Sequence, residues 1–408
     1  MRHCLPSQLI AATLFLLGVS IAAPAQEQAP ADTASYTLRG FDQRIQHGID
    51  LIYNLRFDQA DSYFAEVIAA DPDNPLGYFF RAMVVWWQIL IDLEDRSHDE
   101  AFYRRIEECI KICDRRLDRD EMDFDAILFK AGAIGFRGRL RGDRNQFLKA
   151  ARDGMRCLPL LDKSRQLEPT NKDILFGQGI YNYFAEVIPQ RHSVVRPVMW
   201  LLPDGDREKG IDQLRQVTRE GRYARTEAAY FLVQIYRVFE DEDALALPYL
   251  EELYGRYPAN ALFHRYTARV LVELGHWKRG TALFEDYIAA SRQNRPGYHL
   301  HGLIESLYYV GKYAFVRGAW DRAETALTAA DSLGAGQQRK RDQAYTALAN
   351  LLLGMTYDAQ DRRVAAVERY RRVKKLPRHN DSHQRAKQYI KNPYQSPHPS
   401  SAANGDAP

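Results

Sequence analysis

The sequence lacks the short motifs that mark catalytic and metal-binding proteins. It has no His-Glu-x-x-His pair, no Gly-x-Ser-x-Gly turn, and no phosphate loop ending in Gly-Lys-Ser or Gly-Lys-Thr. His299 and His301 come nearest to a metal pair, but side chains two residues apart on a helix point away from each other. We therefore expect no catalytic residues, no metal, no cofactor and no small-molecule substrate.

Cysteine is scarce, with four residues in a chain of 408. This number excludes a disulfide framework of the kind that holds small secreted domains together. Cys109 and Cys113 lie four residues apart and would pair poorly on one helix. With Cys157 they are expected to be buried apolar residues, although an oxidising compartment would permit one disulfide.

The chain has no large excess of charge, because its formal net charge is +3. This value argues against a general nucleic-acid-binding protein. The exception is the segment 358–391, which has 11 Lys or Arg and 4 Asp or Glu, a local net of +7 against −4 for the remainder. We interpret this basic end either as the solvated face of a terminal helix or as a contact for phospholipid headgroups, nucleic acid or an acidic partner.

Long apolar runs are missing, except near the N-terminus at 9–23. This run is short for a membrane span and is followed by Ala23-Pro24-Ala25, which fits cleavage by signal peptidase before Gln26. We expect residues 1–25 to be a signal peptide and the chain to be periplasmic or secreted, with outer-membrane association as a further option. An uncleaved anchor is the alternative. By composition, 26–40 and 392–408 are expected to be a disordered linker and a disordered tail.

What the sequence does contain is an internal repeat. A small residue is followed by a large apolar residue at +4 and a further apolar residue at +7, which places all three on one helix face. Spacings between successive small residues in the C-terminal half are 36, 34, 43 and 43. The small and large residues are Ala60 and Phe64, Gly210 and Leu214, Ala246 and Leu250, Gly280 and Phe284, Ala323 and Leu327, Ala366 and Tyr370, with Cys157 and Leu161 as a weaker copy.

Three further residue types occur at fixed distances from the small residue of this pattern. A glycine lies 12 residues before the small residue, where two helices would approach closely. An aromatic residue lies three before it, and a proline lies 12 after it, where it ends the second helix. These residues are Gly48, Gly311 and Gly354; Phe57, Trp277 and Trp320; and Pro72, Pro169 and Pro258.

This combination resembles the tetratricopeptide repeat (TPR), and the segments Leu307–Tyr313 and Ala319–Leu327 look like standard examples of it. The resemblance implies an all-α solenoid of about eight helical hairpins in a right-handed superhelix, closed by a C-terminal capping helix. The expected regions are degenerate repeats over 41–220 and more regular repeats with the cap over 221–391. The expected hairpins are 41–72, 75–118, 122–169, 171–220, 224–257, 260–294, 300–333 and 341–377, with the cap at 381–390.

The fourth hairpin has an insertion at 188–205. Its Leu-Pro ending and Gly-Asp-Arg-Glu-x-Gly segment are similar to the eukaryotic TPR proteins linked to the mitochondrial outer membrane and inclusion-body clearance, as is Gly48-Ile49-Asp50-Leu51. Asp204 or Asp206 is expected to cap the next helix. The apolar stretch 194–202 would pack on the solenoid, plug its concave groove, or contact a membrane or partner.

Gly135 to Gly142 is basic and rich in glycine. Such a segment forms either an anion-binding nest or a flexible hairpin turn, and we expect the turn.

In solenoids of this kind the first helix of each hairpin lines the concave side. Counting from the small residues places Phe176, Ile180 and Phe231 on that side, although Phe231 also suits a core position. Basic side chains there would hold a carboxylate while aromatic side chains pack its neighbours. The expected groove residues are Tyr183, Arg265, Arg269, Tyr308, Lys312 and Phe315.

These patterns favour an exported scaffold that binds a protein or peptide partner through its concave groove, without catalysis. The alternative is a structural envelope protein that docks on anionic lipid through the basic C-terminal end and the 194–202 stretch. No nucleic-acid partner is expected.

Overall fold

The computed structural model describes residues 35–191 and 204–396, and within these ranges it contains helices and no strand. The helices of the first half are α1 Ser35–Tyr53, α2 Phe57–Ala70, α3 Pro75–Ile91, α4 Asp99–Leu117, α5 Phe124–Asp143, α6 Phe147–Leu167, α7 Ile174–Arg191 and α9 Arg207–Glu220. Those that follow are α10 Arg225–Gln234 with the π-helical η3 Ile235–Phe239, α11 Asp243–Arg256, α12 Ala261–Glu273, α13 Trp277–Arg292, α14 Leu300–Val316, α15 Trp320–Gly334, α16 Lys340–Ala359, α17 Arg363–Val373 and α18 Ser382–Lys391.

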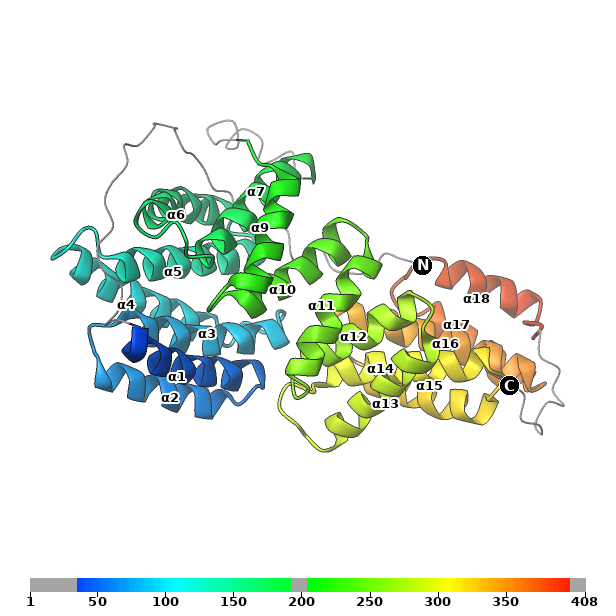
Figure 1. The fold of residues 1–408 in the computed structure, drawn as a ribbon. Coiled ribbons are helices and arrows are strands. Elements are labelled where there is room, and N and C mark those ends of the chain that lie inside the picture. The colour runs from blue at the N-terminus through cyan, green and yellow to red at the C-terminus, as the bar shows by residue number, and fades with distance from the viewer. Residues whose placement is uncertain (1–34, 192–203, 397–408) are drawn as a thin grey trace. The chain divides into compact units, whose positions relative to one another are not determined.

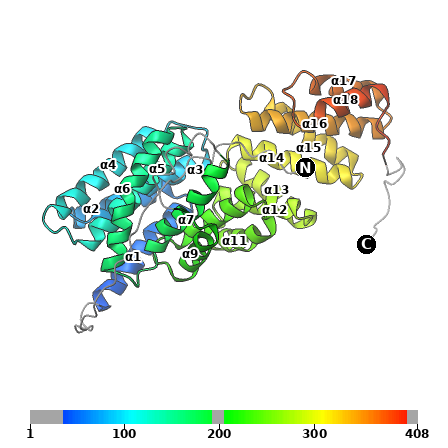
Figure 2. The ribbon, with the colours of Figure 1, turned by 90° about the horizontal axis from the view of Figure 1, so that it is seen from above.

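Successive helices pair as antiparallel hairpins, and within each of the two units defined below neighbouring hairpins stack side by side (Figures 1 and 2). The pairs are α1/α2, α3/α4, α5/α6, α7/α9, α10/α11, α12/α13, α14/α15 and α16/α17, and α18 packs against α17 and α16. The expected all-α solenoid of eight hairpins with a terminal helix is therefore confirmed.

The chain divides into two compact units between Ala259 and Asn260. We call them the N-terminal unit and the C-terminal unit and describe each separately. From the sequence we predicted a boundary at 220/221, between the degenerate and the more regular repeats. Helix α1 begins at Ser35, inside the segment assigned to a linker, whereas the signal peptide, the 194–202 stretch and the end of the tail lie outside the described residues.

One contact recurs inside the hairpins. A side-chain carbon added at Gly48 would lie 2.5 Å from the Phe64 ring, and one added at Gly354 would lie 2.3 Å from the Tyr370 ring. In α14 the glycine of the same phase, Gly311, faces Leu327 in the same way. The two helices approach closely at this glycine, as predicted, and the large residue at +4 packs directly on the bare backbone of the first helix of its own hairpin.

The turn between the two helices also repeats in six of the hairpins. Five residues before the small residue, the backbone adopts a left-handed conformation that glycine and asparagine tolerate best. These residues are Leu55, Asn145, Asp241, Gly275, Gly318 and Asp361. Asn145 places the small residue of the third hairpin at Ala150, so the copy assigned to Cys157 is two helical turns too late.

Several helices begin with a side-chain cap. The Asp206 carboxylate accepts a hydrogen bond from the backbone N–H of Lys209 over 2.9 Å and opens α9, as predicted. Asn74, Asp123 and Asn260 cap α3, α5 and α12 in the same way. Each cap satisfies backbone donors that the first helical turn leaves unpaired.

The predicted turn at Gly135–Gly142 is wrong, because α5 continues through this segment to Asp143. The glycines there are helical, and none is among the residues with positive φ. Gly138 lies 12 residues before Ala150, and an added carbon would lie 3.1 Å from the Asp153 side chain. It therefore serves close packing of α5 on α6 rather than a change of chain direction.

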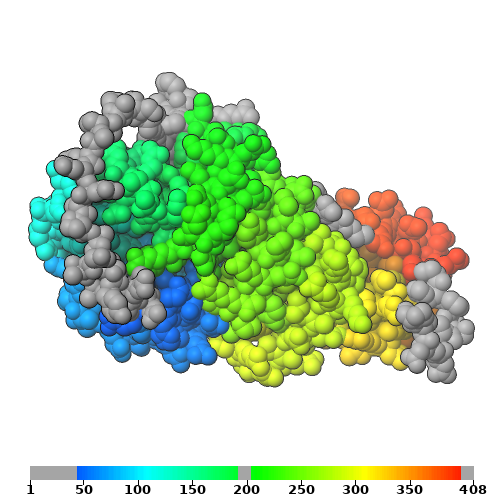
Figure 3. Space-filling view, viewed as in Figure 1, coloured from blue at the N-terminus to red at the C-terminus, as the bar shows by residue number. Residues whose placement is uncertain are grey.

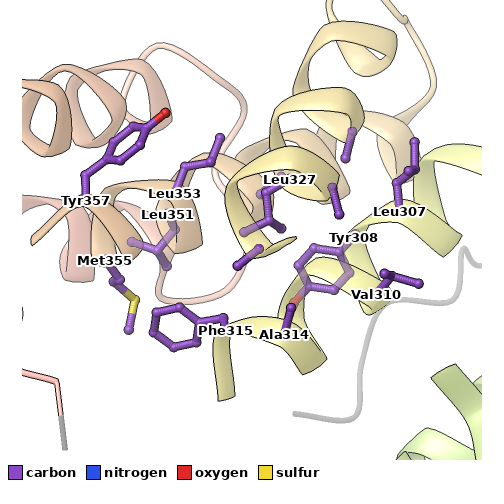
Figure 4. Close-up of a cluster of buried hydrophobic side chains, with 14 of the residues drawn as sticks. Leu307, Tyr308, Val310, Ala314, Phe315, Leu327, Leu351, Leu353, Met355 and Tyr357 are labelled. Atoms are coloured by element: carbon purple, nitrogen blue, oxygen red, sulfur yellow. The ribbon is translucent and has the colours of Figure 1, made fainter. Parts of the chain in front are cut away.

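The space-filling view in Figure 3 shows one face of the molecule, on which side chains cover the helices of both units. In the C-terminal unit a continuous core runs through α14, α15, α16 and α17. Figure 4 shows the Phe315 ring of α14 beside Met355 of α16 in this core. The terminal helix closes it, because Ala386 is fully buried and the Tyr389 ring lies 5.6 Å from that of Tyr370.

We predict that Gly48→Ala lowers the free energy of unfolding by roughly 1–3 kcal/mol, because the new methyl group overlaps the Phe64 ring. Gly255→Ala is the matched control, since an added carbon there meets no atom within 4 Å. It is expected to be neutral or stabilising by up to about 1 kcal/mol. Urea denaturation followed by circular dichroism measures both, and equal midpoints would contradict the recurrent glycine contact.

Candidate functional site

The N-terminal unit contains a partly enclosed pocket with a volume of about 140 Å³. Its lining comes mainly from α1, α3, α5, α7 and α10, which are the first helices of five successive hairpins. Cys157 and Leu161 of α6 and the short segment at Tyr223 and Ala224 complete the wall. The first helices face one another here, as expected for the concave side of the solenoid.

Aromatic side chains dominate the lining, and their rings touch one another. The Phe80 and Phe129 centroids lie 6.5 Å apart at 72°, and the Phe176 and Phe231 centroids lie 5.3 Å apart at 87°. Such edge-to-face pairs stabilise a fixed arrangement of rings. The nine aromatic residues of the lining are Tyr53, Phe79, Phe80, Trp87, Phe129, Phe136, Phe176, Tyr223 and Phe231.

Glycines of α5 leave the space that the pocket occupies. Leu128, Gly132, Gly135 and Arg139 follow one another at helical spacing and all line the pocket. A carbon added at Gly135 would meet no atom within 4 Å, so this backbone faces open space. Gly135 therefore leaves space in the pocket because it has no side chain, and it does not interrupt the helix.

Arg139 is the positive group of the pocket, and its side chain is 3% exposed. Its guanidinium carbon lies 4.1 Å from the centre of the Phe231 ring and 4.8 Å from that of Trp86. The charge is therefore held by the electron-rich faces of two rings.

Glu227 is the matching negative group, with 6% exposure. One of its oxygens, Oε1, accepts hydrogen bonds from Trp87 Nε1 at 2.6 Å and from the Tyr53 hydroxyl at 3.3 Å. Burial raises the pKa of this carboxyl, and the positive charge of Arg139 opposes the shift. Arg139 and Glu227 therefore compensate each other electrostatically without forming a close ion pair.

Asp173 also lines the pocket, but it has a positioning role. Its carboxylate accepts hydrogen bonds from the backbone N–H groups of Arg222, Tyr223 and Ala224 over 2.9–3.2 Å. These bonds fix the segment that carries Tyr223 into the wall. The Tyr223 ring then contacts those of Phe80 and Phe129.

The structure places two predicted groove residues of the C-terminal unit against an acidic partner. Glu305 is fully buried, and Arg269 Nε donates to its Oε1 over 2.5 Å. Arg265 Nη1 lies 3.8 Å from the other oxygen of Glu305. Both cations are thus buried and compensated from inside the protein. Their role in binding a partner stays a prediction.

The other four predicted residues are also packed. Tyr308 and Phe315 belong to the C-terminal core, and Lys312 Nζ lies 5.0 Å from the centre of the Trp277 ring. Tyr183 lies in the N-terminal unit, where it is fully buried and its hydroxyl donates to Glu240. The predicted groove residues are thus divided between the two units, and their contact with a partner stays a prediction.

The pocket was partly visible in the sequence. Phe176, Ile180 and Phe231 were placed on the concave side, and all three line it. The contributions of α3 and α5 were missed, because the α5 glycines were interpreted as a turn. Two glycines at helical spacing before Arg139 would have been the signal.

Three further findings concern the cysteines, the potential metal ligands and the apolar helices of the described residues. Cys109, Cys113 and Cys157 are buried free thiols, as expected for apolar packing. No cluster of three potential metal-ligating side chains occurs within 35–191 and 204–396. None of the helices in that part of the chain combines the length and apolar character needed to cross a bilayer.

No protein-family model and no curated protein matches the chain. Among solved structures, the human IFIT1 dimer with PPP-AAAA matches 79% of this chain and 69% of its own, at 12% identity and a TM-score of 0.41. The human IFIT1 dimer with m7Gppp-AAAA matches 79% of this chain and 68% of its own, at 13% identity and a TM-score of 0.43. A tetratricopeptide repeat protein from Parabacteroides merdae matches 76% of this chain and 99% of its own, at 14% identity and a TM-score of 0.29. The P58(IPK) TPR domain matches 86% of this chain and 96% of its own, at 12% identity and a TM-score of 0.23.

The likeness at these identities concerns the fold alone, and the ligands named with those structures belong to those proteins. The eight helical hairpins described above are by themselves what makes this chain TPR-like.

The pocket region also contains a titratable group that links stability to pH. Burial raises the pKa of Asp143, one turn after Arg139 on α5, from 3.8 to about 7, against the lowering influence of Arg139. The folded state therefore binds more protons than the unfolded state between pH 4 and 7. This contribution to stability is fully present below pH 3.8 and is lost as pH rises through about 7.

We predict that Asp143→Asn reduces the fall in melting temperature between pH 5 and pH 8, because the amide cannot ionise. Asp58→Asn, at an exposed position in the first turn of α2, removes the same charge and is expected to leave the fall unchanged. Differential scanning calorimetry at the two pH values measures the effect. A fall of the same size in the Asp143→Asn variant would show that this carboxyl does not cause it.

Proposed function

We propose that this protein is an exported, non-catalytic scaffold that binds a protein or peptide partner through the concave face of its N-terminal unit. The observation that carries the proposal is the pocket between α1, α3, α5, α7 and α10. A concave, apolar site with few polar groups is the usual form of a binding site, and aromatic-lined cavities hold the central residues of interfaces.

The construction of the pocket supports this proposal. A void in an ordinary core is unfavourable, because protein interiors pack about as densely as organic crystals. Here the space is bordered by Gly135, where any side chain would have occupied it. The charged residues Arg139 and Glu227 are held in place beside it. The fold therefore keeps an apolar space at the position where solenoid scaffolds present their concave face.

Export is part of the proposal and depends on the sequence of the first 25 residues. The apolar run and the Ala23-Pro24-Ala25 site support a signal peptide that delivers the chain to the periplasm or outside the cell. Mass spectrometry of the N-terminus of the protein from its native host tests this directly. A mature chain that begins at Gln26 supports export, and one that retains residues 1–25 argues for an anchor or against export.

We predict that Gly135→Leu abolishes capture of the partner, because its side chain fills the space between α5 and the facing helices. The mature chain is immobilised, incubated with envelope extract, and the bound proteins are identified by mass spectrometry. Gly255→Leu is the matched control, since Gly255 is an exposed helical glycine with equally open surroundings outside the pocket.

The expected result is one protein recovered by the wild type and by Gly255→Leu but lost with Gly135→Leu. A partner that all three variants recover equally would place the binding surface elsewhere, with Arg265, Arg269 and Lys312 as the next residues to substitute. No reproducible partner for the wild type would contradict the proposal.

A second candidate function is docking on an anionic membrane through the basic C-terminal end. Arg362, Arg363, Arg369 and Arg372 are paired with acidic side chains of the same unit. Other cations of this end, including Lys374, Lys375 and Arg378, are exposed on the short segment after α17. Exposed basic clusters are attracted to anionic lipid headgroups at low ionic strength.

We predict that replacing Lys374, Lys375 and Arg378 with Ala weakens sedimentation of the mature chain with vesicles that contain phosphatidylglycerol. Replacing the exposed residues Lys149, Arg152 and Arg156 of α6 with Ala removes the same charge and serves as the control. Binding should fall as salt rises. If the wild type does not sediment with these vesicles, or if both triple variants behave alike, the membrane role of this end is wrong.

A further inference from the structure

We propose that the pocket of the N-terminal unit binds one uncharged aromatic ring system, of the size of benzene to indole, either as a free molecule or as the side chain of a peptide. This inference rests on the proposed function, because it names the chemical class of the group that the concave face receives. Three properties of the pocket determine this class: its size, the nature of its lining and the sign of its charges.

The size of the pocket suits a single ring system. Its volume of about 140 Å³ is close to that of the apolar cavities of about 150 Å³ that bind benzene in proteins. Gly135 adds room on the α5 side, because an added carbon there meets nothing within 4 Å. The Phe79 ring closes the pocket at Gly132, where an added carbon would lie 3.1 Å from it. A fused two-ring system therefore has room only at Gly135, and a longer aliphatic chain would have to leave the pocket.

The lining favours an aromatic ring over other apolar groups. The nine aromatic side chains present both edges and faces, since neighbouring pairs such as Phe129 and Phe80, or Phe231 and Phe176, stand nearly perpendicular. A ring that enters the pocket finds partners for edge-to-face and offset contacts on several sides. Phe79 joins these groups, because its ring contacts those of Phe80, Phe129 and Phe136.

The charges of the pocket favour a ligand without net charge. Arg139 and Glu227 line it with opposite signs, and both side chains are more than nine-tenths buried. The third charged residue of the lining, Asp173, is occupied by backbone N–H groups. Arg139 and Glu227 already offset each other electrostatically, although Arg139 Nε and Nη1 and Glu227 Oε2 have no hydrogen-bond partner among the described residues. A polar atom on a neutral ring could pair with these groups, whereas a carboxylate or an ammonium group would add a net charge. Either would leave one buried charge uncompensated, which is unfavourable in an apolar site.

The test compares three probes of one ring system by isothermal titration calorimetry with the mature full chain. Indole is neutral, indole-3-carboxylate is an anion and tryptamine is a cation. Indole is expected to bind, and the two charged probes at least about tenfold more weakly because of the buried charge that each would add. N-acetyl-tryptophanamide is the fourth probe. If it binds more tightly than indole, a peptide side chain is the source of the ring; if it binds more weakly, a free molecule is.

Gly135→Leu is expected to abolish indole binding, and Gly255→Leu is expected to leave it unchanged. If Gly135→Leu melts at a lower temperature than the wild type, Gly135→Ala replaces it, because its smaller side chain enters space that is open and weakens binding less. Three outcomes would overturn the inference: a wild type that does not bind indole, charged probes that bind as tightly as indole, or Gly135 variants that bind it unchanged.

The failure of this inference can be told apart from failure of the proposed function. A chain that binds indole but captures no partner contradicts the partner-binding function alone. A chain whose partner capture depends on Gly135, but which does not bind indole, contradicts the aromatic class alone.

Discussion

In three of the hairpins, the packing of one large side chain on the bare backbone of a glycine determines how closely the two helices approach. Phe64 on Gly48, Leu327 on Gly311 and Tyr370 on Gly354 are the same contact at the same phase. It sets the distance between the two helices of a hairpin, and the left-handed residue five positions before the small residue sets the turn between them. The hairpins then stack with their first helices on one side, so that side chains of those helices can build a shared surface.

Helix α5 uses glycine in two different ways. Gly138 lies against Asp153 and keeps the hairpin closed, whereas Gly135 faces open space. The first glycine serves packing, and the second removes a side chain from the concave side of the N-terminal unit. The aromatic residues of α3, α7 and α10 surround that space, and Arg139 and Glu227 bring balanced charge to it. The same residue type thus serves helix packing at one position and borders the pocket three residues away.

Periodicity predicted the fold well, because the phased marks are local and each has one physical cause. It failed in the third hairpin, where Gly154 occupies the position of the large residue at +4 from Ala150, so that Cys157 fitted the pattern better than Ala150 did. We also predicted a turn at Gly135–Gly142 from its many glycines, because the sequence alone does not show which neighbours a helical glycine faces. The predicted cations Arg265 and Arg269 show the same limit. Glu305 lies against both from another helix, and only the packing reveals that arrangement.

The most direct test of this account is a crystal structure of the mature chain grown with 4-bromoindole, with anomalous data collected at the bromine edge. The account predicts one strong bromine peak between α3, α5 and α10, next to Gly135 and Phe231. A pocket filled by its own side chains, or a bromine peak only outside the N-terminal unit, would contradict the claim that this solenoid keeps an aromatic binding pocket on its concave face.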